Sequence, residues 1–249
     1  MLRLKTSDPD FDAKFARIVN DRRESEADVA RTVQDILGRV RSHGDAALIE
    51  HTMRFDSYPL RTEEDWRIGQ EACEHAFKAL DPKLREALEL AAGRIRDYHE
   101  HQLPRDRDYT DEAGIRLGAR WRAVDAAGLY VPGGRASYPS SLLMNAIPAQ
   151  VAGVERIVVV TPTPKGETNP LVLAAAHLLG IDEIWRIGGA QAIGALAYGT
   201  ERIRPVDVIV GPGNAFVAEA KRQLDGVVGI DMVAGPSEIL VIADGKNDP

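Results

Sequence analysis

Short runs of β-branched residues alternate with alanine-rich amphipathic segments from Trp121 onward, and this alternation limits the fold more than any other feature of the sequence. It is typical of parallel βαβ units, because each parallel strand requires a long crossover before the next one. The predicted strands span residues 127–131, 156–161, 183–187 and 207–210, and the predicted helices start at Ser141, Pro170, Ala190 and Asn214. The second half of the chain is therefore predicted to be an α/β unit built on a doubly wound parallel sheet.

A fifth apolar run, residues 238–243, is predicted to form one more strand. A parallel strand normally leads into a crossover helix, and residues 244–249 are too few to supply one. We therefore expect the chain to be a truncated part of a longer fold.

Up to about Gln102 the pattern is helical rather than strand-like. One apolar stripe, with spacings typical of a helix that faces a core, consists of Val29, Val33, Ile36, Leu37 and Val40. Thr62 followed by acidic residues, and Asp81 followed by Pro82, are typical helix starts. The charged stretch 105–108 is predicted to be a solvated connection between the two halves of the chain.

Three glycine-bearing loops follow predicted strands and precede predicted helices: residues 132–134, 188–191 and 211–214. The carboxyl ends of parallel strands lie at one edge of a sheet, where doubly wound proteins bind ligands. Helix-start N–H groups at such loops favour phosphate or carboxylate groups. The loops are therefore predicted to outline one ligand cleft, although the sequence contains neither G-x-G-x-x-G nor a P-loop motif.

Four polar side chains in or beside these loops are candidates for ligand contact: Tyr130, Gln191, Asn214 and Ser237. Each also has a structural interpretation. Tyr130 fits the edge of a core, Asn214 is a good helix N-cap with or without a ligand, and Ser237 suits a turn. Gln191 is the more diagnostic residue, because glutamine is a weak capping residue.

The composition excludes several classes of function. The chain has 31 basic and 38 acidic residues, a formal charge of -7 and no basic cluster, so nucleic acid is an unexpected partner. No apolar run is long enough to cross a membrane, and the first residues lack the hydrophobic stretch of a secretory signal, so we expect a cytoplasmic protein. The six histidines, His51 among them, form no metal-binding motif with the single Cys73 and are predicted to be surface residues.

Five sequence blocks, in order, resemble the histidinol dehydrogenase family. They are GLYVPGG, YPSS, GGAQAI, GPGNAFV and AGPSE, at residues 128–134, 138–141, 188–193, 211–217 and 234–238. The resemblance implies a zinc- and NAD-dependent homodimer that converts L-histidinol to L-histidine with two NAD molecules. It also implies that Tyr130, Gln191 and Asn214 contact NAD and that Ser237 contacts the substrate.

The same resemblance implies a helical N-terminal segment followed by an incomplete Rossmann-like sheet. The expected divisions are an arm (1–25), a first segment of a discontinuous domain (26–127), a Rossmann-like domain (128–236) and a returning strand (237–249). The family's zinc ligands and catalytic residues are expected beyond Pro249, so the chain alone is expected to be inactive. A related dehydrogenase of another polar alcohol, such as a sulfonated diol, and a short product that binds nucleotide or dimerises without catalysis are the alternatives.

Overall fold

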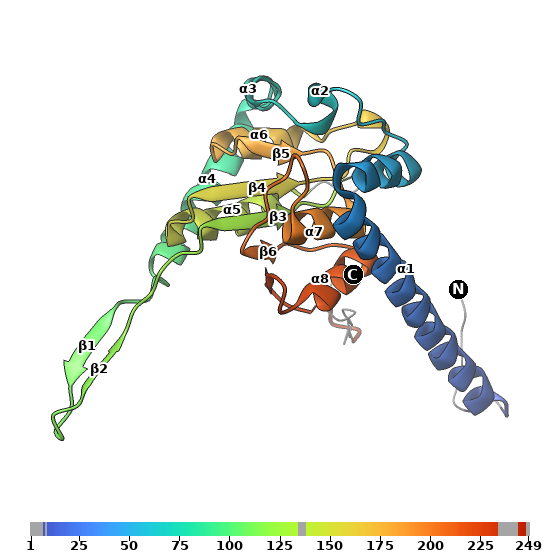
Figure 1. Cartoon of the computed structure of the whole chain (residues 1–249), viewed down its shortest axis with the longest axis horizontal. Coiled ribbons are helices and arrows are strands. Elements are labelled where there is room, and N and C mark those ends of the chain that lie inside the picture. The colour runs from blue at the N-terminus through green and yellow to red at the C-terminus, as the bar shows by residue number, and fades with distance from the viewer. Residues whose placement is uncertain (1–6, 8, 134–137, 234–243, 248–249) are drawn as a thin grey trace.

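A parallel sheet organises the molecule, as predicted, and its described part has five strands (Figure 1). The computed structural model describes residues 7, 9–133, 138–233 and 244–247. The strands are β3 (Ala126–Tyr130), β4 (Arg156–Val160), β5 (Glu183–Trp185), β6 (Val208–Val210) and β7 (Gly229–Ile230). Their order is β5-β4-β3-β6-β7, so the chain reverses direction across the sheet between β3 and β6. This order matches the first five strands of a Rossmann sheet, with β3 as the first strand.

Helices cover both faces of this sheet, and their starts lie within two residues of the predicted ones. One face packs against α5 (Pro139–Ala152) and α6 (Pro170–Leu178), and the other packs against α7 (Gly189–Tyr198) and α8 (Ala215–Leu224). Alternate residues of β3 serve the two cores, since Leu129 belongs to the first and Tyr130 to the second. Gly128, which precedes Leu129 in β3, permits the close approach of α7, because a Cβ on this residue would lie only 2.8 Å from Leu196 Cδ1.

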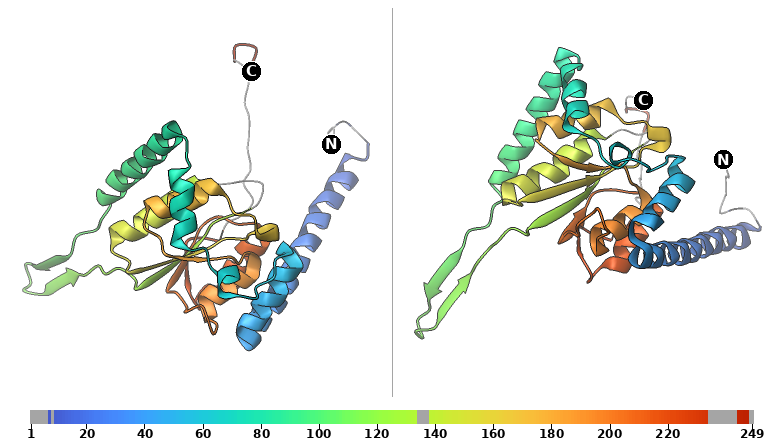
Figure 2. Two further views of the ribbon diagram at one scale, coloured as in Figure 1. Left: turned by 90° about the horizontal axis from the view of Figure 1, so that it is seen from above. Right: turned by 45° about the horizontal axis from the view of Figure 1, so that its top comes forward.

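The N-terminal helix α1 (Phe11–Asp56) packs on α7 and α8 through the predicted apolar stripe. It bends at Gly44, where φ is 49° and ψ is −127°. The carboxylate of Glu201 accepts a hydrogen bond from the Asp45 N–H over 2.7 Å, which caps the helix immediately after the bend. The two halves of α1 therefore run in different directions (Figure 2).

Three shorter helices, α2 (Glu63–Trp66), α3 (Gln70–Lys78) and α4 (Pro82–Glu100), continue the chain. The last two form an outer layer, because α3 packs on α6 and α4 packs on α5. The predicted helix starts are confirmed at both positions. Asp65 accepts from the Thr62 N–H over 2.7 Å, and Asp81 accepts from the Lys83 N–H over 2.9 Å.

A β-hairpin begins in the charged stretch 105–108, which was predicted to be a solvated connection. Its strands are β1 (Arg107–Thr110) and β2 (Arg116–Ala119), which pair antiparallel and extend away from the sheet (Figure 1). Both strands are solvent-exposed, as expected for the charged stretch, and the hairpin itself was not predicted. Asp111 explains the turn, because its carboxylate accepts from the Ala113 and Ile115 N–H groups over 2.9 and 2.8 Å.

The remaining expectations about the fold have different outcomes. The predicted strand at 238–243 lies outside the described residues, and the predicted domain boundaries stay a prediction. Strand β7 was not expected from the sequence. Among the helices that the structure describes, none combines the length and apolarity that crossing a bilayer requires.

Candidate functional site

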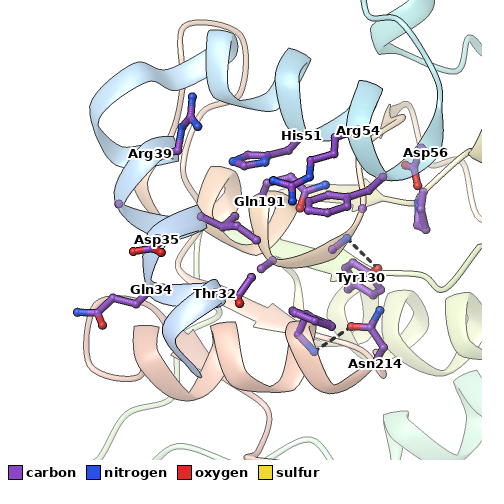
Figure 3. A pocket seen from close by; sticks show the side chains of 18 of the residues that line it. Thr32, Gln34, Asp35, Arg39, His51, Arg54, Asp56, Tyr130, Gln191 and Asn214 are labelled. Carbon is purple, nitrogen blue, oxygen red and sulfur yellow. Dashed lines mark hydrogen bonds between the residues drawn. The ribbon is translucent and has the colours of Figure 1, made fainter. Parts of the chain in front are cut away.

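A cavity of about 1030 Å³ opens at the carboxyl edge of the sheet, beside the place where the strand order reverses (Figure 3). Residues at or after the ends of four different strands border it: Tyr130 at the end of β3, Pro162 after β4, Gly188 after β5 and Asn214 after β6. The opposite wall comes from α1. Three of the four predicted site residues, Tyr130, Gln191 and Asn214, therefore meet at one cavity, and Ser237 lies outside the described residues.

Tyr130 holds the first turn of α7 in place. Its side chain is buried, and its hydroxyl oxygen accepts a hydrogen bond from the Gly189 N–H over 3.1 Å. Burial raises the pKa of the Tyr130 hydroxyl, and this outweighs the opposite effect of the Gly189 hydrogen bond. A neutral tyrosine thus borders the cavity, with an aromatic ring that a flat ligand group can contact.

Gln191 carries the clearest sign of a missing ligand. It is only 2% exposed, yet its Oε1 atom is buried with no hydrogen-bond partner among the described residues. Buried polar atoms without a partner are rare, because each one costs free energy that a hydrogen bond would otherwise offset. The carbonyl oxygen of Gln191 is therefore available to an N–H or O–H group of a molecule in the cavity.

Asn214 is the N-cap of α8. Its Oδ1 atom accepts from the Phe216 and Val217 N–H groups over 3.0 and 3.1 Å. The structural interpretation of this residue is thus confirmed. Because the carbonyl oxygen is engaged, the amide nitrogen of Asn214 is the group that can donate to a ligand.

These contacts correct one expectation about the loops. The N–H groups of Gly189, Phe216 and Val217 were expected to face an anion, but the side chains of Tyr130 and Asn214 accept from them. Because side chains beside the loops already accept hydrogen bonds from these backbone N–H groups, recognition of a ligand at these positions depends on side chains instead.

The loop at Gly211 is fixed by an ion pair whose lysine is buried. Lys221 Nζ donates to the Gly211 carbonyl over 2.6 Å and to Asp231 Oδ1 over 2.7 Å. Asp231 Oδ2 accepts in turn from the Gly211 N–H over 2.9 Å. Asp231 is therefore a structural residue that holds the backbone beside the cavity.

The described residues of the first loop do not border the same cavity. Pro132 and Gly133 instead line a neighbouring hollow of about 460 Å³, together with Thr163 and Asn169. The prediction that all three loops outline one cleft is thus wrong for this part of the loop. A Cβ on Gly133 would lie 2.1 Å from the Pro162 carbonyl oxygen, which shows that this segment packs against the loop after β4.

The wall formed by α1 was missed in the sequence. Its half after the bend places His51, Arg54 and Asp56 at the cavity (Figure 3). His51 is 3% exposed, so its assignment to the surface was wrong. Burial lowers the pKa of His51, and neither ring nitrogen has a hydrogen-bond partner among the described residues. A usable signal existed, because the buried residues Ala47, Leu48, His51 and Thr52 continue a helical stripe.

Replacing His51 by Gln should make the protein less sensitive to acid. The lowered pKa of the folded state means that neutral His51 contributes stability above pH 6.5 and that this contribution is lost as the pH falls through the lowered pKa. The melting temperature between pH 7.5 and 5 should therefore decline less in His51→Gln than in the wild type. The control is His43→Gln, an exposed histidine on the same helix, which should decline like the wild type. An identical decline in His51→Gln would show that His51 does not titrate with unfolding.

Metal binding finds no support in the described part of the chain. No three His, Cys, Asp or Glu residues there lie close enough together to hold an ion. Cys73 is buried, as the sequence suggested, and burial raises the pKa of its thiol. The cavity is bordered by tyrosine, amide, imidazole and carboxylate side chains.

Comparison with known proteins identifies the family of this chain. The sequence profile of histidinol dehydrogenase matches residues 19–249. The chain belongs to the histidinol dehydrogenase family. It is similar to the histidinol dehydrogenase of Zymomonas mobilis, with 59% identity over 249 residues, and to that of Rhodospirillum rubrum, with 60% identity over 248 residues.

Histidinol dehydrogenase relatives are longer than this chain. The match covers 100% of the chain but 58% of the Zymomonas mobilis protein and 57% of the Rhodospirillum rubrum protein. A solved structure, the histidinol dehydrogenase of Elizabethkingia anophelis, superposes with a TM-score of 0.78 at 36% identity and covers 83% of this chain and 48% of that one. The sequence matches therefore cover just over half of the two relatives, and the structural match covers just under half of the Elizabethkingia anophelis chain.

Proposed function

We propose that this chain forms the NAD site of an enzyme that oxidises L-histidinol to L-histidine with two NAD molecules and zinc. The observation that carries the proposal is the convergence of Tyr130, Gln191 and Asn214 on one cavity at the reversal of the sheet. Family membership supplies the reaction, and the switch point of a doubly wound sheet is where such folds bind nucleotides. The volume of about 1030 Å³ is at the upper end of ordinary ligand sites, as a dinucleotide requires.

The residues of the cavity fit the chemistry of NAD. Tyr130 offers a ring face, Gln191 offers a buried acceptor without a partner among the described residues, and Asn214 offers an amide donor. NAD, when bound, supplies the acceptor for the hydride that leaves the alcohol carbon. In this proposal the side chains orient the cofactor and exclude water from it.

Zinc is a different case. The described residues contain no cluster that fits the ion, so we route no step of the reaction through them. Ser237 as a substrate contact, the domain divisions and a cytoplasmic homodimer stay part of the proposal. The zinc ligands and the catalytic residues are proposed to lie outside these 249 residues.

Replacing Gln191 by Leu should weaken NADH binding by about tenfold or more, because a hydrogen bond to a buried acceptor is lost. The melting temperature without ligand should not fall, since the substitution removes a buried oxygen that has no partner among the described residues. Titration of this chain with NADH, followed by cofactor fluorescence, measures the first effect. Gln102→Leu, at an exposed glutamine, is the control. Unchanged NADH binding in Gln191→Leu would remove Gln191 from the site.

The substrate is tested separately. The complete reading frame that encodes this chain should yield a protein that produces NADH from L-histidinol when zinc and NAD are present. NADH binding without this activity would favour a related dehydrogenase of another polar alcohol or a nucleotide-binding protein without catalysis. Formation of NADH from a sulfonated diol, measured by absorbance, distinguishes these two alternatives. The related dehydrogenase should produce NADH, and the protein without catalysis should not.

A further inference from the structure

Asp56, the last residue of α1, is a carboxylate that the described residues leave without a partner at the cavity. It borders the cavity, and its Oδ2 atom is buried with no hydrogen-bond partner among those residues. Burial alone raises the pKa of Asp56. The oxygens of such a carboxylate can accept hydrogen bonds from a ligand.

The position of Asp56 in the fold is informative. In Rossmann sheets that bind NAD, an acidic residue after the second strand binds the ribose hydroxyls. The second strand here is β4, and the residues after it are Thr161, Pro162, Thr163 and Pro164, none of them acidic. Asp56 borders the same cavity as Pro162 and Pro164, because the end of α1 packs against this loop. The carboxylate thus reaches the end of β4 from a helix outside the sheet.

Arg54 is the residue at the cavity that could favour NADP over NAD, since in Rossmann sheets an arginine near this position accommodates the 2′-phosphate of NADP. Residues two apart on a helix do not face each other, although Arg54 and Asp56 both border the cavity. The Arg54 guanidinium lies over the Phe55 ring, 5.3 Å from its centroid. The Arg54 guanidinium is thus engaged by a neighbouring ring, whereas Asp56 Oδ2 has no hydrogen-bond partner among the described residues.

We propose that the Asp56 carboxylate accepts hydrogen bonds from the two hydroxyl groups of the adenosine ribose of the cofactor and thereby selects NAD over NADP. A carboxylate accepts hydrogen bonds only, and the vicinal hydroxyls of a ribose are two adjacent donors. The 2′-phosphate of NADP removes one donor and places negative charge against the carboxylate. The inference rests on the proposed NAD site and adds the residue that determines cofactor specificity.

The test compares NADH and NADPH binding to this chain by fluorescence titration. The wild type should bind NADPH at least about tenfold more weakly than NADH, and Asp56→Asn should lose about tenfold in NADH affinity while NADPH changes little. The two affinities should therefore approach each other in Asp56→Asn. Asp28→Asn, at an exposed aspartate of the same helix, should behave as the wild type.

Thermal unfolding without ligand separates this role from a structural one. The raised pKa means that Asp56 stabilises the fold below pH 3.8 and that this contribution is lost as the pH rises through the raised pKa. At neutral pH Asp56→Asn should therefore melt no lower than the wild type. Asp56→Ser is a second variant with the same expected binding result.

Three results would overturn the inference. NADH binding that is unchanged in both variants excludes the contact, and equal weakening of NADH and NADPH excludes the selection. Equal affinity of the wild type for NADH and NADPH excludes the selection as well. A wild type that binds neither cofactor contradicts the proposed NAD site itself, which is a different failure from tight NADH binding that ignores Asp56.

Discussion

Gly211→Ala is expected to lower the free energy of unfolding by about 3–5 kcal/mol, the sum of backbone strain and overpacking. The φ of Gly211 is +116°, which side chains rarely adopt, and a Cβ there would lie 2.2 Å from the Tyr130 carbonyl oxygen. The loop cannot shift easily, because Lys221 and Asp231 hold both the N–H and the carbonyl of Gly211. Urea denaturation measures the change, which is a large part of the roughly 5–15 kcal/mol of a typical domain.

The matched control is Gly226→Ala. Gly226 also has a positive φ, +88°, but a Cβ at this position would have no described atom within 4 Å. Only backbone strain applies there, so the expected loss is about 1 kcal/mol. Equal losses at the two positions would show that contact with Tyr130 is not what makes glycine necessary at Gly211.

Arg156→Met is expected to lower the free energy of unfolding by about 3 kcal/mol, since it leaves a largely buried carboxylate without its partner. Arg156 and Glu183 are 16% and 17% exposed and form two parallel hydrogen bonds of 2.9 and 2.8 Å. Arg156 also donates to the carbonyls of Arg204 and Pro205 over 3.1 and 2.9 Å. One side chain therefore joins β4, β5 and the segment before β6.

The double variant Arg156→Met, Glu183→Gln should recover part of this loss, because it removes the unpaired charge. Burial acts to raise the pKa of Glu183, but hydrogen bonds from Arg156 and Trp185 outweigh it, so the pKa lies below its usual value of 4.5. The contribution of the pair is thus present above pH 4.5 and lost as the pH falls through the lowered pKa. A difference between wild type and Arg156→Met that does not shrink in acid would contradict this account.

The sheet and the three site residues could be predicted because their signals are local. Strands such as β4 are apolar almost throughout, since parallel strands are buried on both faces, and glycine or asparagine marks the start of helices such as α8. Topology then does the rest, because it brings the carboxyl ends of parallel strands to one edge. Tyr130, Gln191 and Asn214 could be placed together for this reason alone.

The remaining features depend on contacts that short sequence windows do not reveal. Strand β7 has only the residues Gly229 and Ile230 and takes its conformation from β6. The cavity wall of α1 depends on the bend at Gly44, which Glu201 caps from a distant part of the sequence. The helical stripe that contains His51 could thus indicate burial, but not that His51 and Asp56 border a cavity.

The bend at Gly44 also makes the helical register of the later half of α1 independent of the register of the earlier half. In an unbroken helix one inserted residue would rotate every later side chain by about 100°. Here the Asp45 N–H is anchored to Glu201, so the orientation of the later half is set at that point. Evolution can thus lengthen or shorten the earlier half without turning His51 or Asp56 away from the cavity.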